Sequence, residues 1–145
     1  MKKISEIKVT YSSNNIEKPT IKSSLDSYNV LSEHWNQDTI ELHEEFKVLL
    51  LNRANKALGV YHLSKGGVSG TVVDAKLIFS VALKCTASSI ILAHNHPSCN
   101  EKPSQADIDI TNKIKAGCKC LDLTLLDHLI LIKDSYFSFA DEGLI

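Results

Sequence analysis

The sequence of 145 residues lacks three features that would assign it to a particular class of protein. No apolar run approaches the ~20 residues that a transmembrane helix needs. The amino terminus begins Met-Lys-Lys but has no apolar signal core. An excess of charge of one sign is also lacking, because 16 Lys and Arg residues balance 17 Asp and Glu residues. We therefore expect a cytoplasmic protein with no membrane partner, and no global attraction to nucleic acid.

The four cysteines form no Cys-x-x-Cys pair, and in a cytoplasmic chain a disulfide framework is not expected. Cys118 and Cys120 lie two residues apart near the end of a helical pattern, so they point in different directions rather than at one metal ion. We interpret Cys85, Cys118 and Cys120 as small buried residues. Cys99 belongs to a different segment, described below.

Length and composition indicate one globular domain. Hydrophobic residues make up 43% of the chain and charged residues 23%, which is the range of folded proteins. A chain of this length buries roughly 68–70% of the surface that its unfolded form exposes. Residues 1–22 are polar and irregular, and they predict an N-terminal arm, with an edge strand over 7–11 as the alternative. Residues 23–145 are predicted to form the domain.

Hydrophobic periodicity predicts helices and strands that alternate along the domain. Helical spacing covers residues 23–38, 74–87 and 104–118, with strand patterns over 46–51, 58–63, 90–93, 123–132 and 136–139. The first two strands flank a turn-rich segment, 52–55, and should form an antiparallel hairpin. This order predicts an α/β fold in which helices sandwich a mixed β-sheet.

The segment from His94 to Asp107 carries the residue types of a metal site. His94 and His96 lie two residues apart at the end of a predicted strand, so both imidazoles can reach one ion. Pro97 ends that strand and Pro103 precedes the next helix, whose first turn carries Asp107 and can return its carboxylate to the strand end. Two imidazoles and one carboxylate leave a fourth position for water, as a catalytic zinc requires.

Simpler interpretations exist for each part of this segment. Two histidines at a strand end can be polar loop residues. Ser104 and Asp107 have the spacing of a capping box, in which both side chains bond to the backbone at the start of a helix. Neither interpretation explains why the histidines, the prolines and the acid occur together.

The segment also matches a known pattern: His-x-His-Pro, six residues, Ser, two residues, Asp. The matching residues, without a gap, are His94, His96, Pro97, Ser104 and Asp107. The sequence thereby resembles the JAMM (JAB/MPN) metalloproteases, and residues 89–92, 126–129 and 139–144 resemble their bacterial RadC-like branch. The resemblance covers residues 23–145 and implies the JAB/MPN fold, which has a cytidine-deaminase-like architecture.

The resemblance implies a role for each residue of the pattern. His94, His96 and Asp107 would ligate Zn²⁺, and Ser104 would donate a hydrogen bond to the developing oxyanion. The family also uses a glutamate at the start of an upstream strand as the general base on the zinc-bound water.

Two glutamates stand at that upstream position, and the resemblance selects Glu44, which lies two residues before Phe46. The strand period agrees, because Glu44 shares a face with Phe46 whereas Glu45 shares the opposite face with Lys47. A carboxylate that faces an apolar layer is desolvated, which raises its pKa toward the range that a general base needs.

The sequence departs from the RadC-like pattern at two places. Cys99 stands where glycine is usual; it is either a loop residue, which we favour, or a further metal ligand three residues after His96. Residues 1–40 contain no helix-hairpin-helix segment, so a stand-alone domain is expected, which weakens an inference of DNA binding. Asp127 and His128 are interpreted as a structural hydrogen-bonded pair rather than a substrate contact, and His62 as a packed core residue.

The leading hypothesis is a zinc-dependent hydrolase that cleaves a peptide or isopeptide bond in a peptide or protein substrate. The alternative is a non-catalytic, metal-containing binding module associated with DNA repair or mobile elements. A metal-dependent nuclease fits less well, because the pattern supplies no second carboxylate-rich site for two-metal phosphodiester chemistry.

Overall fold

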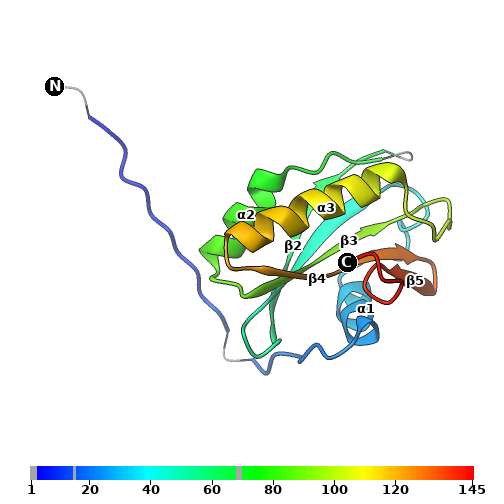
Figure 1. The fold of residues 1–145 in the computed structure, drawn as a ribbon, viewed down its shortest axis with the longest axis horizontal. Helices are drawn as coiled ribbons and strands as arrows, with labels where there is room; N and C mark the ends of the chain where they lie inside the picture. Colours follow the sequence, from blue (N-terminus) through cyan, green and yellow to red (C-terminus); the bar gives the residue numbers. More distant parts are fainter. Residues whose placement is uncertain (1–2, 15, 68–69) are drawn as a thin grey trace.

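The computed structural model describes residues 3–14, 16–67 and 70–145, and one five-stranded sheet organises them (Figure 1). In spatial order the strands are β2 (Ala57–Lys65), β1 (Glu45–Leu51), β3 (Ser89–Asn95), β4 (Thr124–Ile132) and β5 (Ser135–Ser138). β3 and β4 run parallel, whereas the other neighbouring strands run antiparallel, including the predicted hairpin of β1 and β2. The predicted mixed sheet is confirmed.

Helices cover both faces of this sheet. α1 (Ser24–Glu33) packs on one face, and α2 (Ala75–Lys84) and α3 (Gln105–Cys120) pack on the other (Figure 1). Because strand side chains alternate, β1 to β4 each contribute to both cores. Val48 packs beneath α2 and α3, and its neighbour Leu49 packs beneath α1. The sheet is therefore sandwiched between helices, as the sequence predicted.

Each helix begins at a capping side chain. The side chains of Ser23, Asp74 and Ser104 accept hydrogen bonds from backbone N–H groups of the first turns of α1, α2 and α3. These bonds satisfy donors that have no partner within the helix.

The end of α1 differs from the prediction, because the helix stops at Glu33 rather than near residue 38. The ammonium group of Lys47 donates to the backbone carbonyl of His34 and lies 4.6 Å from the centre of the Trp35 ring. Trp35 lies outside the helix, but it is buried in the core between α1 and the sheet. A contact from β1, which helical periodicity cannot reveal, thus fixes the chain where α1 ends.

The N-terminal side of the domain is irregular. Residues 3–14 contain no helix or strand and are exposed, so the alternative of an edge strand over 7–11 is not formed, and Figure 1 shows this segment running away from the sheet. Thr20 forms an antiparallel bridge with Lys56, and Ile21 is buried. Within the described ranges, the length and hydropathy of the helices exclude a membrane-spanning one.

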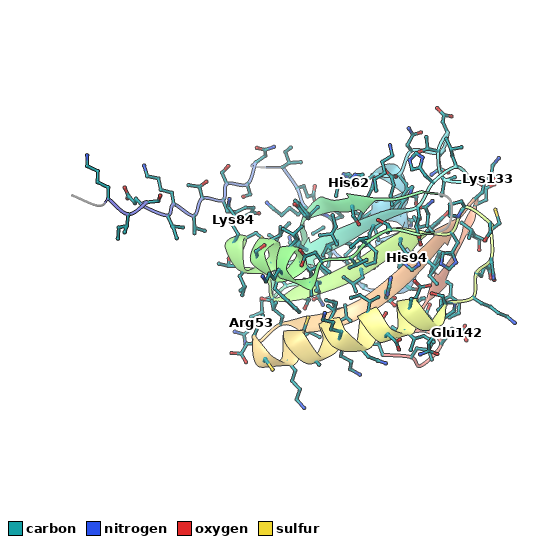
Figure 2. The ribbon with its side chains drawn as sticks, turned by 90° about the horizontal axis from the view of Figure 1, so that it is seen from above. Arg53, His62, Lys84, His94, Lys133 and Glu142 are labelled. Carbon is teal, nitrogen blue, oxygen red and sulfur yellow. The ribbon has the colours of Figure 1, made fainter. Side chains whose placement is uncertain are left out.

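Two side chains are placed differently from the prediction. His62 is not a core residue: its side chain is 47% exposed, because β2 is an edge strand (Figure 2). Cys120 is exposed in the last turn of α3, whereas Cys85 and Cys118 are buried as predicted.

Candidate metal centre

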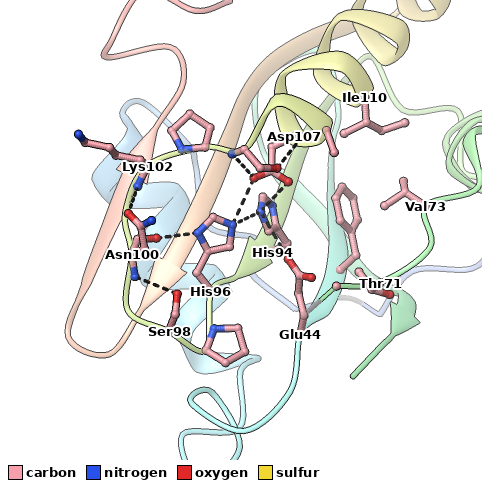
Figure 3. A pocket seen from close by; sticks show the side chains of 16 residues that line it. Glu44, Thr71, Val73, His94, His96, Ser98, Asn100, Lys102, Asp107 and Ile110 are labelled. Carbon is pink, nitrogen blue, oxygen red and sulfur yellow. Dashed lines mark hydrogen bonds and ion pairs between the residues drawn. The ribbon is translucent and has the colours of Figure 1, made fainter. Parts of the chain in front are cut away.

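The residues of the His-x-His-Pro pattern line an open pocket of about 700 Å³. The pocket lies where β3 ends and α3 begins, beside the segment that enters β1 (Figure 3). Glu44, His94, His96 and Asp107 all direct their side chains into it, and Ser104 is part of its wall. The structure therefore brings together the five residues that the sequence singled out.

His94 and His96 point their Nε2 atoms toward each other, at a distance of 3.0 Å. The Nδ1–H of His96 donates to the carbonyl oxygen of Asn100 at 2.6 Å, and a carbonyl oxygen can only accept. In the neutral imidazole of His96 the lone pair is therefore on Nε2, which faces His94 and Asp107. His94 is almost completely buried, and its ring stacks on that of Phe46.

Asp107 contacts both histidines. Its Oδ1 atom lies 3.3 Å from Nε2 of His94, and its Oδ2 atom lies 3.2 Å from Nε2 of His96. The same carboxylate accepts a hydrogen bond from the backbone N–H of Ser104, while the Ser104 hydroxyl accepts one from the N–H of Asp107. Asp107 therefore forms the capping box and also lies beside both histidines. The cap holds its carboxylate toward the pocket.

The charges in this cluster shift each other's pKa. Burial alone would raise the pKa of Asp107, but the close contacts with the His94 and His96 imidazoles, which favour the charged carboxylate, outweigh it and hold the pKa well below its usual value. Burial would lower the pKa of His96, yet the hydrogen bonds to Asp107 and to the Asn100 carbonyl raise it above its usual value. Without a metal ion, these shifts favour a charged Asp107 carboxylate beside a His96 that protonates more readily than an exposed histidine.

Glu44 lies just before β1, and its backbone is tied to the neighbouring loop. Its N–H donates to the carbonyl of Gly67, and its carbonyl accepts from the N–H of Gly66. The Oε1 atom lies 3.8 Å from Nε2 of His94. Burial raises the pKa of the Glu44 carboxyl, against the opposing effect of His94 and His96.

Glu45 points elsewhere. Its Oε1 atom lies 3.6 Å from Nε2 of His62 on β2, on the opposite face of the strand from Glu44. Glu44, His94 and His96 offer ligand atoms that all lie within 4.8 Å of one another, so these residues could hold a metal ion. The roles of ligand and base that the sequence suggested remain predictions at this point.

Cys99 lies in the loop that connects β3 to α3. Its φ of +63° is in the left-handed region, which explains why glycine would suit this position. Its side chain is exposed, and the described lining of the pocket includes Ser98 and Asn100 but not Cys99. Of the two alternatives left by the sequence, the loop residue is the one that this placement supports.

The sequence did not reveal the hydrogen-bond partners of the Asp127 and His128 side chains. The carboxylate of Asp127 accepts from the Ser138 hydroxyl at 2.6 Å and from the backbone N–H groups of Ala140 and His128. The His128 side chain points to the other face, where its Nε2 lies 2.8 Å from Nδ1 of His94. The two residues are thus hydrogen-bonded through the Asp127 carboxylate and the His128 backbone N–H, but their side chains point to opposite faces and do not bond to each other.

A β-bulge accounts for the placement of His128. Ile90 of β3 pairs with Leu125, but Ile91 pairs with Asp127, so Leu126 is an extra residue of β4. The extra residue shifts the alternation of side chains by one position and turns His128 toward His94, behind the pocket. A bulge of this kind leaves no mark in the hydrophobic pattern of a single sequence.

A family model and three curated relatives relate the chain to known proteins. A family model described as RadC-like JAB domain matches residues 21–144. A UPF0758 protein of Flavobacterium johnsoniae is 52% identical over 102 residues, which are 70% of this chain and 44% of that protein. A UPF0758 protein of Porphyromonas gingivalis is 50% identical over 103 residues, covering 70% and 45%. One from Fusobacterium nucleatum is 39% identical over 131 residues, covering 90% and 56%. The chain thus spans about half the length of these curated relatives.

Proposed function

Because the chain belongs to the RadC-like JAB domain family, we propose that it is a zinc-dependent hydrolase of the JAMM type that cleaves a peptide or isopeptide bond. The observation that carries this proposal is the arrangement of His94, His96 and Asp107. Their atoms converge at 3.0, 3.2 and 3.3 Å, and a half-buried glutamate lies on the same side of the pocket.

The donor set suits zinc. In a tetrahedral site with metal–ligand bonds of about 2.0–2.1 Å, neighbouring ligand atoms are roughly 3.3 Å apart, close to the spacing found here. Two imidazole nitrogens and one carboxylate oxygen form a ligand set known from catalytic zinc sites, which keep a fourth position for water. When bound, zinc supplies Lewis acidity and lowers the pKa of its water toward ~7.

Glu44 is the residue that supports catalysis rather than structural metal binding. Its raised pKa makes the carboxylate a better proton acceptor near neutral pH than an exposed glutamate. The position of its Oε1 atom, 3.8 Å from His94, places it at the edge of the ligand cluster, where it can accept a proton and later deliver it to the leaving amine.

Ser104 would act on the carbonyl oxygen of the substrate. Its hydroxyl oxygen accepts from the N–H of Asp107, which leaves the hydroxyl proton to be donated into the pocket. Because the capping box fixes the side chain, little reorganisation would be needed as negative charge develops on the substrate oxygen. The open pocket, with Val73 and Ile110 in its wall, suits an extended peptide segment.

The proposal is tested by loading the metal-free protein with zinc and assaying hydrolysis. We expect about one zinc per chain, and cleavage of a fluorogenic peptide library or of an isopeptide-linked protein pair. A chelator should abolish this cleavage and added zinc should restore it. Stoichiometric zinc without hydrolysis would instead favour a non-catalytic metal-containing module, and absence of zinc binding would contradict the metal site itself.

A further inference from the structure

A line of hydrogen bonds runs behind the metal-facing atoms, through residues that the proposed mechanism does not use. Nδ1 of His94 lies 2.8 Å from Nε2 of His128, and Nδ1 of His128 lies 2.6 Å from Oγ1 of Thr111. Thr111 in turn donates to the backbone carbonyl of Asp107 at 2.6 Å. This buried relay (His94, His128, Thr111 and the Asp107 carbonyl) begins and ends on two candidate ligands.

The Asp107 end of the relay determines where every proton lies. A carbonyl oxygen only accepts, so the hydroxyl proton of Thr111 is directed to Asp107. Nδ1 of His128 must then donate to Thr111, and the neutral ring keeps Nε2 as an acceptor. That acceptor requires the proton of His94 to be on Nδ1. The lone pair of His94 is left on Nε2, the atom that faces His96 and Asp107.

Packing makes this arrangement rigid. His128 is completely buried, and Thr111 and His94 are almost so, which keeps water from offering other partners. The ring of His128 stacks on Phe139, with ring centres 4.7 Å apart, and meets the edge of Phe46 at 5.6 Å. The rotation of His128 is therefore fixed independently of its hydrogen bonds.

We propose that His128 and Thr111 are positioning residues, which hold His94 in the tautomer and orientation that direct Nε2 to the metal. The proposal rests on the zinc site of the proposed function. It explains why a β-bulge at Leu126 turns His128, rather than Asp127, toward the pocket. It also connects His94 to the helical turn that carries Asp107, so that both ligands are fixed by one network.

The matched variants Thr111→Val and Thr111→Ser test the role of the hydroxyl. Valine keeps the shape of threonine but cannot accept from His128, whereas serine keeps the hydroxyl. Mutation of the outer-shell partners of metal ligands typically weakens metal binding 10–100-fold, and Thr111 supports the His128 partner of His94. We expect a loss of zinc affinity in this range for Thr111→Val and a smaller loss for Thr111→Ser, measured by competition with a chelator.

A control separates positioning from general loosening of α3. Ile114→Val lies almost one turn further along α3, at a completely buried position outside the relay. It should lower thermal stability without a comparable loss of zinc affinity. Equal zinc affinity of Thr111→Val and Thr111→Ser, or an equal loss in Ile114→Val, would overturn the positioning role.

Nitrogen NMR of the wild-type protein tests the proton positions directly, even if a variant fails to fold. In the zinc-loaded protein, Nδ1 of both His94 and His128 should carry the proton. A proton on Nε2 of His128 would overturn the relay. Zinc binding without hydrolysis would contradict the proposed function alone, because the affinities and proton positions would still decide the role of His128 and Thr111.

Discussion

The two faces of the sheet both carry buried polar side chains, but these side chains have different partners. On the α1 face, the side-chain oxygen of Asn95 accepts from the N–H of Glu45, and its amide donates to the carbonyls of Ile40 and His43. Asp127 likewise accepts three hydrogen bonds. The side chains of Asn95 and Asp127 are therefore satisfied by the protein, and they hold the loop before β1 and the C-terminal segment in place.

On the α2–α3 face, polar atoms of the pocket face one another instead. Nε2 of His94, Nε2 of His96 and the Asp107 carboxylate approach one another as potential electron-pair donors. Such a convergence of electron-pair donors is what a bound metal ion would require, and these residues could hold one. Both faces carry buried polar residues, so residue type alone does not identify the candidate site. What distinguishes the site is that its polar atoms face one another, whereas Asn95 and Asp127 bond to the backbone or to a serine hydroxyl.

Adjacent residues divide between these two faces. The three pairs are Glu44 and Glu45, His94 and Asn95, and Asp127 and His128. In each pair one residue contributes to the pocket or its support, and its neighbour contributes to the scaffold. Substitutions within such pairs can therefore test the comparison with the local backbone held constant.

The largest effect is expected for Asp107→Asn. Asparagine keeps an oxygen that can accept from the N–H of Ser104, but it removes the charge that faces both histidines. Zinc affinity should fall by more than the ~100-fold that follows loss of a ligand's hydrogen-bond partner, with the fold retained. Asp127→Asn, on the scaffold side, is the matched control and should leave zinc affinity nearly unchanged. Intact zinc binding with reduced thermal stability would show that Asp107 is a helix cap only.

Asn95→Ala should lower stability and leave the zinc affinity of the folded protein nearly unchanged, the opposite of Asp107→Asn. It leaves the Glu45 N–H and the carbonyls of Ile40 and His43 without their buried partner. We expect the free energy of unfolding to fall by roughly 2–3 kcal/mol, since an unsatisfied buried group costs about 1–3 kcal/mol. Denaturant unfolding measures this loss. A large fall in the zinc affinity of the folded protein, without loss of stability, would contradict the division between the two faces.

Zinc affinity should depend on pH through His96. Despite burial, hydrogen bonds to Asp107 and Asn100 raise the pKa of His96 in the metal-free protein, and its proton competes with zinc for Nε2. Affinity should therefore fall as pH decreases through this raised pKa, by about tenfold per pH unit for one proton, beginning above pH 6.5. Chelator competition between pH 6 and 8.5 measures it. Constant affinity over this range would exclude His96 as a ligand.

The smallest effect is expected at Cys99. Because its φ is +63°, Cys99→Gly relieves the strain of a side chain in the left-handed region, for a gain of about 1 kcal/mol or less. Cys99→Ala removes the thiol but keeps the β-carbon, so it should not be stabilising. Neither variant should change zinc affinity. If both weaken zinc binding, the thiol contributes to the site after all.

Much of this architecture could be predicted from local sequence. Ser23, Asp74 and Ser104 carry the capping chemistry that starts each helix, and strand periodicity predicted the face that Glu44 occupies. The placement of Asp107 beside the histidines follows from a helix cap that turns its carboxylate back toward β3.

The features that escaped prediction depend on contacts between distant segments. At the end of α1, Lys47 of β1 binds the carbonyl of His34, a contact between segments that helical periodicity does not contain. His62 is exposed because β2 lies at the edge of the sheet, a property of strand order. The relay through His128 requires the bulge at Leu126, which is a property of the pairing between β3 and β4. Periodicity within one segment contains none of this information.

The most direct test of the central claim compares Glu44→Gln with Glu45→Gln. Glu44→Gln should retain zinc, because His94, His96 and Asp107 are unchanged, but it removes the proton acceptor. Hydrolysis should fall by ~10²–10⁴-fold, the usual contribution of a general base. Glu45→Gln should retain both zinc and activity, since its side chain faces His62. Full activity of Glu44→Gln, or selective loss in Glu45→Gln, would contradict the assignment of catalysis to the α2–α3 face.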